Sequence, residues 1–508
     1  MLARKTVFVI LKEGIAGTLG FITLFFVARF MGAEPLGVAS FALAFVNVFN
    51  IIADMGFNSA HVKRVSEKID TNNCIAVYIR FKIILTISAL GILIGFLALL
   101  EVFHINFYDS TYPEVIYIMI GYFMIVQIMS IPKYTYDAKL QIYRGQISAL
   151  AGVVAKDILV IGAAVLMTIG PYTVVQKGMA LAAGYLIEVL VAAVILYVFF
   201  IREEKIGVYD KKIAKRYLQF AIPFFPVAIF SMLAISADRL TIGYFWDAKE
   251  VGVYTAVQSI ANMLVVVQSA VTLVLFPAVS SEHKGGNIKE IVRLTRDAIK
   301  YILLVLMPVG AGITVFSADI IHVILSDEFL IAEYCFIFLT WYYILFSVSN
   351  TAAVTIGGTD RPKLGARITL VSAVSNILLN FVFVPFWGAT GAALATLLSG
   401  TVYFVMAAYF SRKVLNANIL PVSGVKILVA GAITTLVFYG IKHAFLPAPT
   451  EMRIYVLVPI LIGVLGLFLL LLHLFGEFGK KEIEFFKKAS HIKEMGKGIK
   501  EEIRIKRK

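Results

Sequence analysis

The sequence predicts an all-α polytopic membrane protein of about fourteen transmembrane helices, arranged as two six-helix lobes followed by two C-terminal helices. Three observations predict this fold class. Hydrophobic residues make up 60% of the 508 residues and charged residues only 15%, which leaves too little polar surface to cover a soluble protein of this size. The apolar residues are grouped into stretches long enough to cross a bilayer. A motif near the N-terminus also returns in the middle of the chain.

Fourteen apolar stretches reach the length of about 20 residues that a helix needs to cross the hydrocarbon core. The first follows the opening MLARK, and because no small-residue cleavage site comes after it, we interpret it as a retained helix rather than a signal peptide. The predicted spans are residues 9–29, 36–60, 79–101, 114–132, 146–168, 178–200, 217–245, 251–280, 299–325, 330–356, 367–387, 389–410, 424–443 and 454–475.

The repeated motif indicates an internal duplication. ARFMGAEPLGVASFALAFVN at 28–47 aligns with GYFWDAKEVGVYTAVQSIAN at 243–262, and KGMALAAGYL from Lys177 aligns with TGAALATLLS from Thr390 at nearly the same offset. Six helices separate the copies, an even number, so both copies have the same orientation in the membrane. We predict an N-terminal lobe over residues 1–205, a C-terminal lobe over 206–411, two further helices over 412–476 and a basic cytoplasmic tail over 477–508.

The basic residues predict the orientation in the cell membrane. If the N-terminus is cytoplasmic, 37 of the 46 Lys and Arg residues fall in cytoplasmic segments, as the positive-inside rule requires. We therefore place both termini in the cytoplasm. This distribution also accounts for most of the net charge of +14. No aromatic residues are interleaved with base-reading groups, so we expect the lipid bilayer and not nucleic acid as a partner.

Catalytic motifs are missing from the sequence. It contains no G-x-x-x-x-G-K-[ST] phosphate loop, no H-E-x-x-H metal pair and no G-x-S-x-G nucleophile elbow. Cys74 and Cys335 lie in opposite halves of the chain, so neither a disulfide framework nor a cysteine metal cluster is indicated. We expect no cofactor, no metal and no enzymatic activity. A duplicated helical bundle of this kind is typical of a secondary transporter.

Polar side chains follow one face of the second, eighth and eleventh predicted spans, at helical spacing. Such groups would lose their hydrogen bonds in lipid, so they should face a neighbouring helix or a hydrated cavity. We predict a stripe that faces sugar hydroxyls, with interhelical hydrogen bonding as the alternative for any one residue. The stripe comprises Asn47, Asn50, Asn262, Ser269, Asn376 and Asn380.

Charged residues inside the spans predict an anion-binding lumen, because an intramembrane charge is costly and tends to be functional. Arginine offers forked donors, and lysine a point charge, to phosphate oxygens. The predicted cationic lumen comprises Lys12, Lys156 and Arg239 within spans, and Arg80 and Arg367 nearer the inner face.

Acidic residues near these cations bear on whether the cations are free to bind an anion. Asp238 projects about 100° away from Arg239 on the helix, so we predict that Arg239 faces the lumen as a phosphate ligand; the alternatives are snorkelling or a bridge to another helix. Lys156 could instead form a structural bridge with Glu188. Asp54, Asp238 and Glu188 are candidates for proton or sodium coupling, with structural pairing as the alternative for each.

Three stretches resemble a known family. They are RFMGAEPLGVASFALAF followed by DMGFNSA, then DRLTIGYFWDAKEVGVYTA running to LFPAVS, then GGTDRPKLGARITLVSAVSNILLNFVFVPFWGATGAALATLLSG. Together with the predicted helices and the duplication, they are similar to polysaccharide-exporting flippases of the multidrug/oligosaccharidyl-lipid/polysaccharide superfamily, above all the Wzx-type O-antigen flippases. The resemblance covers most of the first twelve spans.

The resemblance implies a V-shaped two-lobe transporter. It would move an undecaprenyl- or dolichyl-pyrophosphate-linked oligosaccharide from the inner to the outer leaflet, and it would work with polysaccharide assembly proteins. Three alternatives stay open: a lipid II flippase of the MurJ type, a multidrug or cation antiporter, and a membrane-embedded polysaccharide polymerase or glycosyltransferase. The antiporter would favour acidic groups around an apolar pocket. The polymerase would need a larger external loop with catalytic residues.

Overall fold

The computed structural model describes residues 2–103, 112–359, 361–418, 422–446, 448–480, 482 and 484. Every regular element in these ranges is a helix. The helices are α1 (Leu2–Phe30), α2 (Ala33–Asp54), α3 (Phe57–Ser66), α4 (Thr71–Val102), α5 (Pro113–Ala138), α6 (Ile142–Leu166), α7 (Val174–Glu203), α8 (Lys211–Phe245), α9 (Ala248–Asn262), α10 (Val265–Lys284), α11 (Ile288–Ile324), α12 (Glu333–Gly358), α13 (Pro362–Leu415), α14 (Val422–Phe445) and α15 (Ile454–Leu474), with the 3-10 helices η2 (Asp327–Ala332) and η3 (Pro449–Glu451).

Local sequence signals set several of the helix starts. Asp210, Asp247 and Asn287 precede α8, α9 and α11, and the side chain of each accepts a hydrogen bond from a backbone N–H in the first turn. Thr173 and Gln176 form a reciprocal capping box at the start of α7. These side chains satisfy N–H groups that have no partner inside the helix.

The structure confirms a polytopic all-helical membrane protein. Within the described ranges, twelve segments are long and apolar enough to cross a membrane. Two predicted spans are each divided between two helices: residues 36–60 form α2 and α3, and residues 251–280 form α9 and α10. The first break has a local cause, because Met55 and Gly56 both adopt left-handed conformations, with φ of 44° and 82°, that no regular helix contains.

The long helix α13 reverses direction within its length. Gly388 has φ of +51° and interrupts the helical conformation. On its two sides the hydroxyl of Ser372 donates to the carbonyl of Ser399 at 3.0 Å, and Asn376 Nδ2 donates to Thr396 Oγ1 at 3.1 Å. These pairs are nearly symmetric about Gly388, so the two parts of α13 lie antiparallel, and they correspond to the predicted spans 367–387 and 389–410.

The repeated motif forms a very close helix crossing. A methyl group at Gly37 of α2 would lie 1.6 Å from the carbonyl oxygen of Ala248 in α9, and one at Gly252 would lie 1.8 Å from the carbonyl oxygen of Ala33. Gly37 and Gly252, and Ala33 and Ala248, occupy equivalent positions in the two copies. Each copy therefore offers its glycine to the backbone of the other, which is the self-complementary pattern of a two-fold interface.

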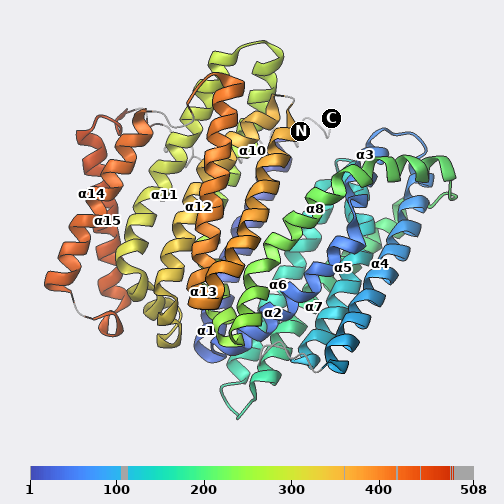
Figure 1. Ribbon diagram of the computed structural model, residues 1–508, viewed down its shortest axis with the longest axis horizontal. Helices are drawn as coiled ribbons and strands as arrows, with labels where there is room; N and C mark the ends of the chain where they lie inside the picture. Colours follow the sequence, from blue (N-terminus) through green and yellow to red (C-terminus); the bar gives the residue numbers. More distant parts are fainter. Residues whose placement is uncertain are drawn as a thin grey trace, which may run out of the picture.

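The helices form two groups that meet at one edge of the molecule. In Figure 1, α14 and α15 stand beside α11 at one end, whereas α4, α5 and α7 stand at the other. The two groups come together at the lower edge and lean apart toward the upper edge. At the meeting point, Arg29 of α1 donates to the carbonyl oxygen of Val323 in α11 at 2.6 Å.

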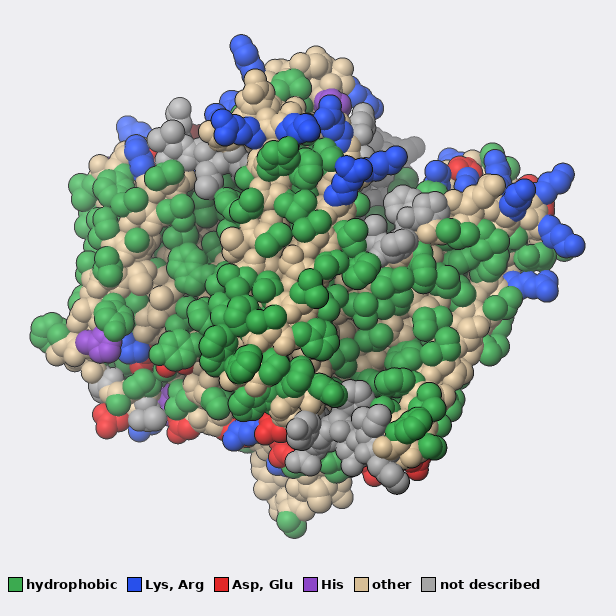
Figure 2. Space-filling view, in the orientation of Figure 1, with side chains coloured by type: hydrophobic (Ala, Val, Ile, Leu, Met, Phe, Trp, Pro, Cys, Tyr) green, Lys and Arg blue, Asp and Glu red, His purple; other side chains and the backbone are tan. Residues whose placement is uncertain are grey.

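The surface carries the charge pattern of a membrane protein. Figure 2 shows a broad hydrophobic band, with Lys and Arg gathered at its upper edge and Asp and Glu at its lower edge. Large apolar side chains on the molecular surface are well exposed, for example Ile87, Val102 and Tyr455. In water this exposure would be unfavourable, whereas in a bilayer these side chains contact lipid.

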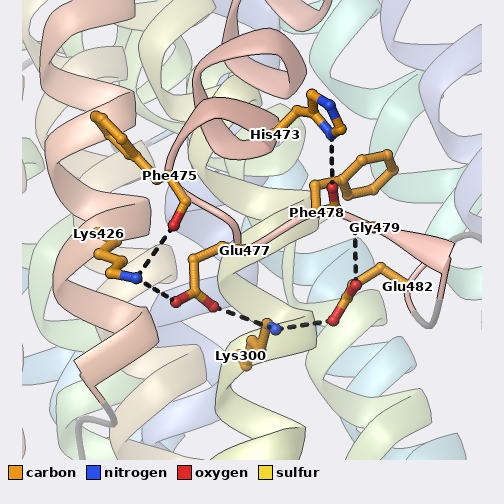
Figure 3. Close-up of polar contacts among 8 residues, drawn as sticks. All are labelled: Lys300, Lys426, His473, Phe475, Glu477, Phe478, Gly479 and Glu482. Carbon is orange, nitrogen blue, oxygen red and sulfur yellow. Dashed lines mark hydrogen bonds and ion pairs between the residues drawn. The ribbon is translucent and has the colours of Figure 1, made fainter.

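A polar cluster ties the segment after α15 to two other helices (Figure 3). Lys300 of α11 pairs with Glu482 at 2.9 Å and with Glu477 at 3.3 Å. Lys426 of α14 pairs with Glu477 at 3.1 Å and donates to the carbonyl oxygen of Phe475 at the same distance. Most of the predicted tail, residues 477–508, lies outside the described residues.

Candidate functional site

Two cavities with charged walls lie on either side of α9. The Arg239 cavity has a volume of about 520 Å³ and is enclosed by α8, α9, α12 and α13. The Lys156 cavity has a volume of about 360 Å³ and is enclosed by α1, α2, α6, α7, α9 and α10. Ser259 and Asn262 of α9 line both. The predicted stripe residue Asn262 thus lies where the two cavities adjoin.

Arg239 lies in the wall of its cavity, as the sequence predicted. The half-buried guanidinium donates through Nε to Thr255 Oγ1 at 3.2 Å and through Nη2 to Gln258 Oε1 at 2.5 Å. Both acceptors are neutral side chains of α9. Within the described part of the chain no carboxylate lies at ion-pair distance from Arg239, so its charge is held in place without being neutralised.

Asp238 lies in a buried hydrogen-bonded cluster that is linked to Arg239 through Gln258, because Gln258 Nε2 also donates to Tyr254 Oη at 3.3 Å. Its carboxylate accepts hydrogen bonds from Tyr254 Oη at 2.5 Å, Asn380 Nδ2 at 2.8 Å, Thr396 Oγ1 at 3.3 Å and Asn376 Nδ2 at 3.4 Å. A buried carboxylate needs such donors. Asp238, Asn376 and Thr396 of this cluster all line the Arg239 cavity.

Three charged groups from α6 and α7 form a cluster at the Lys156 cavity, and Lys156 and Asp157 of this cluster line it. Lys156 Nζ lies 2.9 Å from Glu188 Oε2 of α7, which confirms the predicted bridge, and 3.9 Å from the adjacent Asp157 Oδ1. The aromatic ring of Tyr185 also lies 5.3 Å from Nζ. Asp157 is 2% exposed and faces the hydroxyl of Thr23 on α1. One lysine therefore serves two carboxylates in this cluster.

The remaining predicted cations lie elsewhere. Lys12 pairs with its neighbour Glu13 at 2.9 Å, and it is Glu13 that lines the Lys156 cavity. Arg80 is exposed, with its guanidinium stacked 4.5 Å from the ring of Tyr209, and Arg367 is also exposed; neither lines either charged cavity. Of the five predicted cations, Lys156 and Arg239 line the two charged cavities, and Lys12, Arg80 and Arg367 do not. That any of them binds substrate stays a prediction.

The residues of the predicted polar stripe are likewise not all gathered at the cavities. Asn380 is fully buried and uses its amide on Asp238, and Ser269 is exposed and lines neither charged cavity. Asp54, a predicted coupling residue, accepts a hydrogen bond from the backbone N–H of Asn58 at 3.0 Å across the break between α2 and α3. Its side chain thus serves the start of α3.

Asn47 and Asn50 belong to a hydrogen-bonded chain that the sequence did not reveal. Asn50 Nδ2 donates to Asn47 Oδ1 at 2.8 Å, and Asn50 Oδ1 accepts from Gln127 Nε2. Gln127 Oε1 in turn accepts from Lys82 Nζ at 2.9 Å. Lys82 is 2% exposed. The sequence prediction counted it with the cytoplasmic cations, although its place inside the predicted span 79–101 was a signal for burial.

The fold and the two charged cavities define a membrane transporter. The structure is similar to a lipid II flippase MurJ in an inward closed conformation, with a TM-score of 0.73 and 17% identity over 91% of this chain and 97% of that one. It is also similar to a multidrug resistance MATE family transporter in an inward-facing conformation, with a TM-score of 0.61 and 15% identity over 79% of this chain and 94% of that one. At these identities the likeness concerns the fold.

Sequence comparisons give the family. The model of the family described as "Polysaccharide biosynthesis protein" matches residues 2–283, and the MatE model matches residues 234–382. The chain is 27% identical to the probable low-salt glycan biosynthesis flippase Agl15 of Haloferax volcanii, over 80% of this chain and 83% of that protein. The chain belongs to the polysaccharide biosynthesis protein family. This confirms the resemblance found in the sequence and the prediction of a transporter rather than an enzyme.

Proposed function

We propose that this protein is a flippase that moves a polyprenyl-pyrophosphate-linked oligosaccharide from the inner to the outer leaflet for cell-surface polysaccharide or glycan assembly. The family and the similarity to a protein named as a glycan biosynthesis flippase support the class of transporter. The observation that supports this substrate is Arg239, a cation with no carboxylate at ion-pair distance in the described part of the chain, in the wall of a cavity that several polar side chains also line.

The surroundings of α9 offer all three chemistries of such a substrate. Arg239 supplies forked donors for a pyrophosphate. Aromatic and polar side chains of the same cavity, among them Tyr342, Tyr403 and Ser372, suit the faces and hydroxyls of sugar rings. A third, apolar cavity of about 1020 Å³ between α11 and α15, which Ile260 of α9 also lines, suits a prenyl chain.

We further propose fourteen membrane crossings and the lobes 1–205 and 206–411, followed by two helices over 412–476. The reversal at Gly388 makes two crossings of α13, and α8 supplies one beyond the twelve apolar segments. The pairing of Gly37 with Gly252 supports the duplication. The basic edge of the hydrophobic band supports cytoplasmic termini. The groups of helices would then lean apart toward the cytoplasm.

Two carboxylate clusters are proposed as sites of ion coupling. Asp238 gathers the side-chain donors of Asn376, Asn380 and Thr396 around one buried charge. Glu188 shares Lys156 with Asp157 in the other lobe. Protonation or sodium binding at either cluster would change the charge of a buried group, which is a means of linking an ion gradient to a conformational change.

Reconstitution tests the proposal. The purified protein in liposomes is given a fluorescent polyprenyl-pyrophosphate oligosaccharide, lipid II, or a lipophilic cation, and the outer-leaflet or external fraction is measured. We expect transport of the lipid-linked oligosaccharide. Transport of lipid II alone would favour the lipid II alternative, because both substrates share the lipid pyrophosphate and differ in the headgroup. Transport of the cation alone would contradict the proposal.

A further inference from the structure

Lys82 is a buried ammonium group with no carboxylate at ion-pair distance in the described part of the chain. It lies in α4 and is 2% exposed. Its Nζ donates to the carbonyl oxygen of Ala53 at 3.0 Å and to Gln127 Oε1 at 2.9 Å. Burying an ammonium group without a carboxylate partner costs free energy. Charged residues inside membrane spans are therefore rare and are usually functional.

One of these contacts has a structural explanation. α2 ends at Asp54, so the carbonyl of Ala53 has no partner within the helix and lies at its negative end. Met55 and Gly56 then turn the chain into α3. A cation is favourable at this place, and Lys82 thus stabilises the end of α2. The bond to Gln127 is not needed for that purpose.

The bond to Gln127 fixes the direction of an entire chain of amides. A lysine ammonium can only donate, so Gln127 must present Oε1 to Lys82 and its Nε2 to the next residue. That residue, Asn50, therefore accepts through Oδ1 and donates through Nδ2 to Asn47 Oδ1. Every amide in the chain is oriented by the charge at its start. The chain ends at Asn47 Nδ2, which has no acceptor in the described part of the molecule.

Asn47 is not in the wall of either charged cavity, but helical spacing and the repeat place it on the side of α2 that faces the second copy of the motif. Leu36, which lines the Lys156 cavity, precedes Asn47 by about three helical turns and shares its face of α2. The position equivalent to Asn47 in the second copy of the repeat is Asn262, which lines both charged cavities. Asn47 is itself half-buried. Its amide N–H groups are thus available at the surface between the lobes.

We propose that Lys82 is a positioning residue for the substrate. Through Gln127 and Asn50 it holds Asn47 with the amide nitrogen turned outward, as a hydrogen-bond donor to an anionic oxygen of the transported lipid. This rests on the proposed function, which supplies a substrate with a pyrophosphate. Hydrogen bonds polarise one another along such a chain, so the charge of Lys82 strengthens the donor at Asn47 without leaving its buried site.

Gln127→Glu separates this role from a structural one. The new carboxylate accepts from Lys82 and neutralises it, so the end of α2 keeps its cation and the protein should insert and resist heat as the wild type does. A carboxylate cannot donate to Asn50. Asn50 would then turn its Nδ2 to the new carboxylate, Asn47 would donate to Asn50, and Asn47 would present Oδ1 to the substrate. One isosteric change thus converts the terminal donor into an acceptor.

The test measures binding of a polyprenyl pyrophosphate without glycan to detergent-solubilised protein, and transport of the glycan lipid separately. We expect Gln127→Glu to weaken binding by about tenfold or more, the effect of losing a hydrogen bond to a charged group, while the melting temperature is kept. Gln176→Glu in the external capping box adds the same charge elsewhere and should bind normally. Asn47→Asp, which places an acceptor at the end of the chain directly, should weaken binding as Gln127→Glu does.

The outcomes distinguish the two proposals. Wild-type affinity in Gln127→Glu would overturn the positioning role; if that variant does not fold, wild-type affinity in Asn47→Asp would overturn it. Loss of glycan-lipid transport by Asn47→Asp with wild-type binding of polyprenyl pyrophosphate would overturn the pyrophosphate as the ligand of Asn47. A wild-type protein that binds polyprenyl pyrophosphate in the expected Asn47-dependent way, but moves no glycan lipid, would contradict the proposed function and leave the positioning role standing.

Discussion

Replacing Gly37 with alanine should push α2 and α9 apart where the two copies of the repeated motif cross. The added methyl group would lie 1.6 Å from the carbonyl oxygen of Ala248, whereas nonbonded heavy atoms prefer about 3.5 to 4.0 Å. α2 and α9 must therefore move apart by roughly 2 Å at the crossing. The obstacle is backbone and cannot rotate away, so we expect the upper end of the usual overpacking cost, about 3 kcal/mol. The higher helix propensity of alanine offsets about 1 kcal/mol of this cost. The free energy of unfolding should therefore fall by about 2 kcal/mol in total.

Heat denaturation of the solubilised protein measures this loss. Gly252→Ala meets the carbonyl of Ala33 at 1.8 Å and should lower the melting temperature by a similar amount. The double variant should lose less than the sum, because one separation relieves both contacts. Gly91→Ala in α4 is the control, since a methyl group there meets nothing within 4 Å. A Gly37→Ala protein as stable as Gly91→Ala would refute the close crossing.

Three further predictions concern ion pairs and topology. Lys156→Ala should reduce abundance because it leaves the Glu188 carboxylate without its cation, and adding Glu188→Ala should restore part of it; no restoration in immunoblots of membranes would exclude the pair. Cysteine probes in residues 281–297 should be labelled only from the cytoplasm, whereas external labelling would overturn the topology. Burial raises the pKa of the Glu482 carboxyl, but the hydrogen bonds from Lys300 and from backbone N–H groups, together with the charge of Lys300, outweigh burial and hold that pKa below the ordinary 4.5. A lowered pKa stabilises above pH 4.5, so the segment after α15 should detach, and become open to acid-active proteases, as pH falls through this lowered value.

The sequence predicted much of the fold, because the features that define it are local or periodic. The lengths of the apolar stretches located the helices. They also predicted the two parts of α13 on either side of Gly388 as separate spans. The repeat predicted which residues are equivalent, and the structure brings Gly37 and Gly252 together. The breaks at Met55 and after Asn262 were missed, because neither interrupts the apolar run.

The site was predicted less completely, because helical spacing shows which residues share a face but not which residues of other helices that face contacts. Arg239 and the pair of Lys156 with Glu188 were found from intramembrane charge alone. Asn380 shares the predicted polar face but hydrogen-bonds Asp238, which lies far away in sequence. Lys82 was missed because two charges near a helix end resemble a cytoplasmic cluster, although only Arg80 is exposed.

Transport by the Arg239→Ala protein tests the central claim most directly. In a flippase-deficient cell, the variant should insert at the normal level and reduce the appearance of lipid-linked oligosaccharide on the outer leaflet by about tenfold to a hundredfold, as expected for the loss of hydrogen bonds to a charged group. Arg239→Lys should retain part of the activity, because it keeps the charge and loses the fork. Arg80→Ala, which removes an exposed arginine outside both charged cavities, should transport normally. Wild-type transport by a normally expressed Arg239→Ala protein would contradict the account.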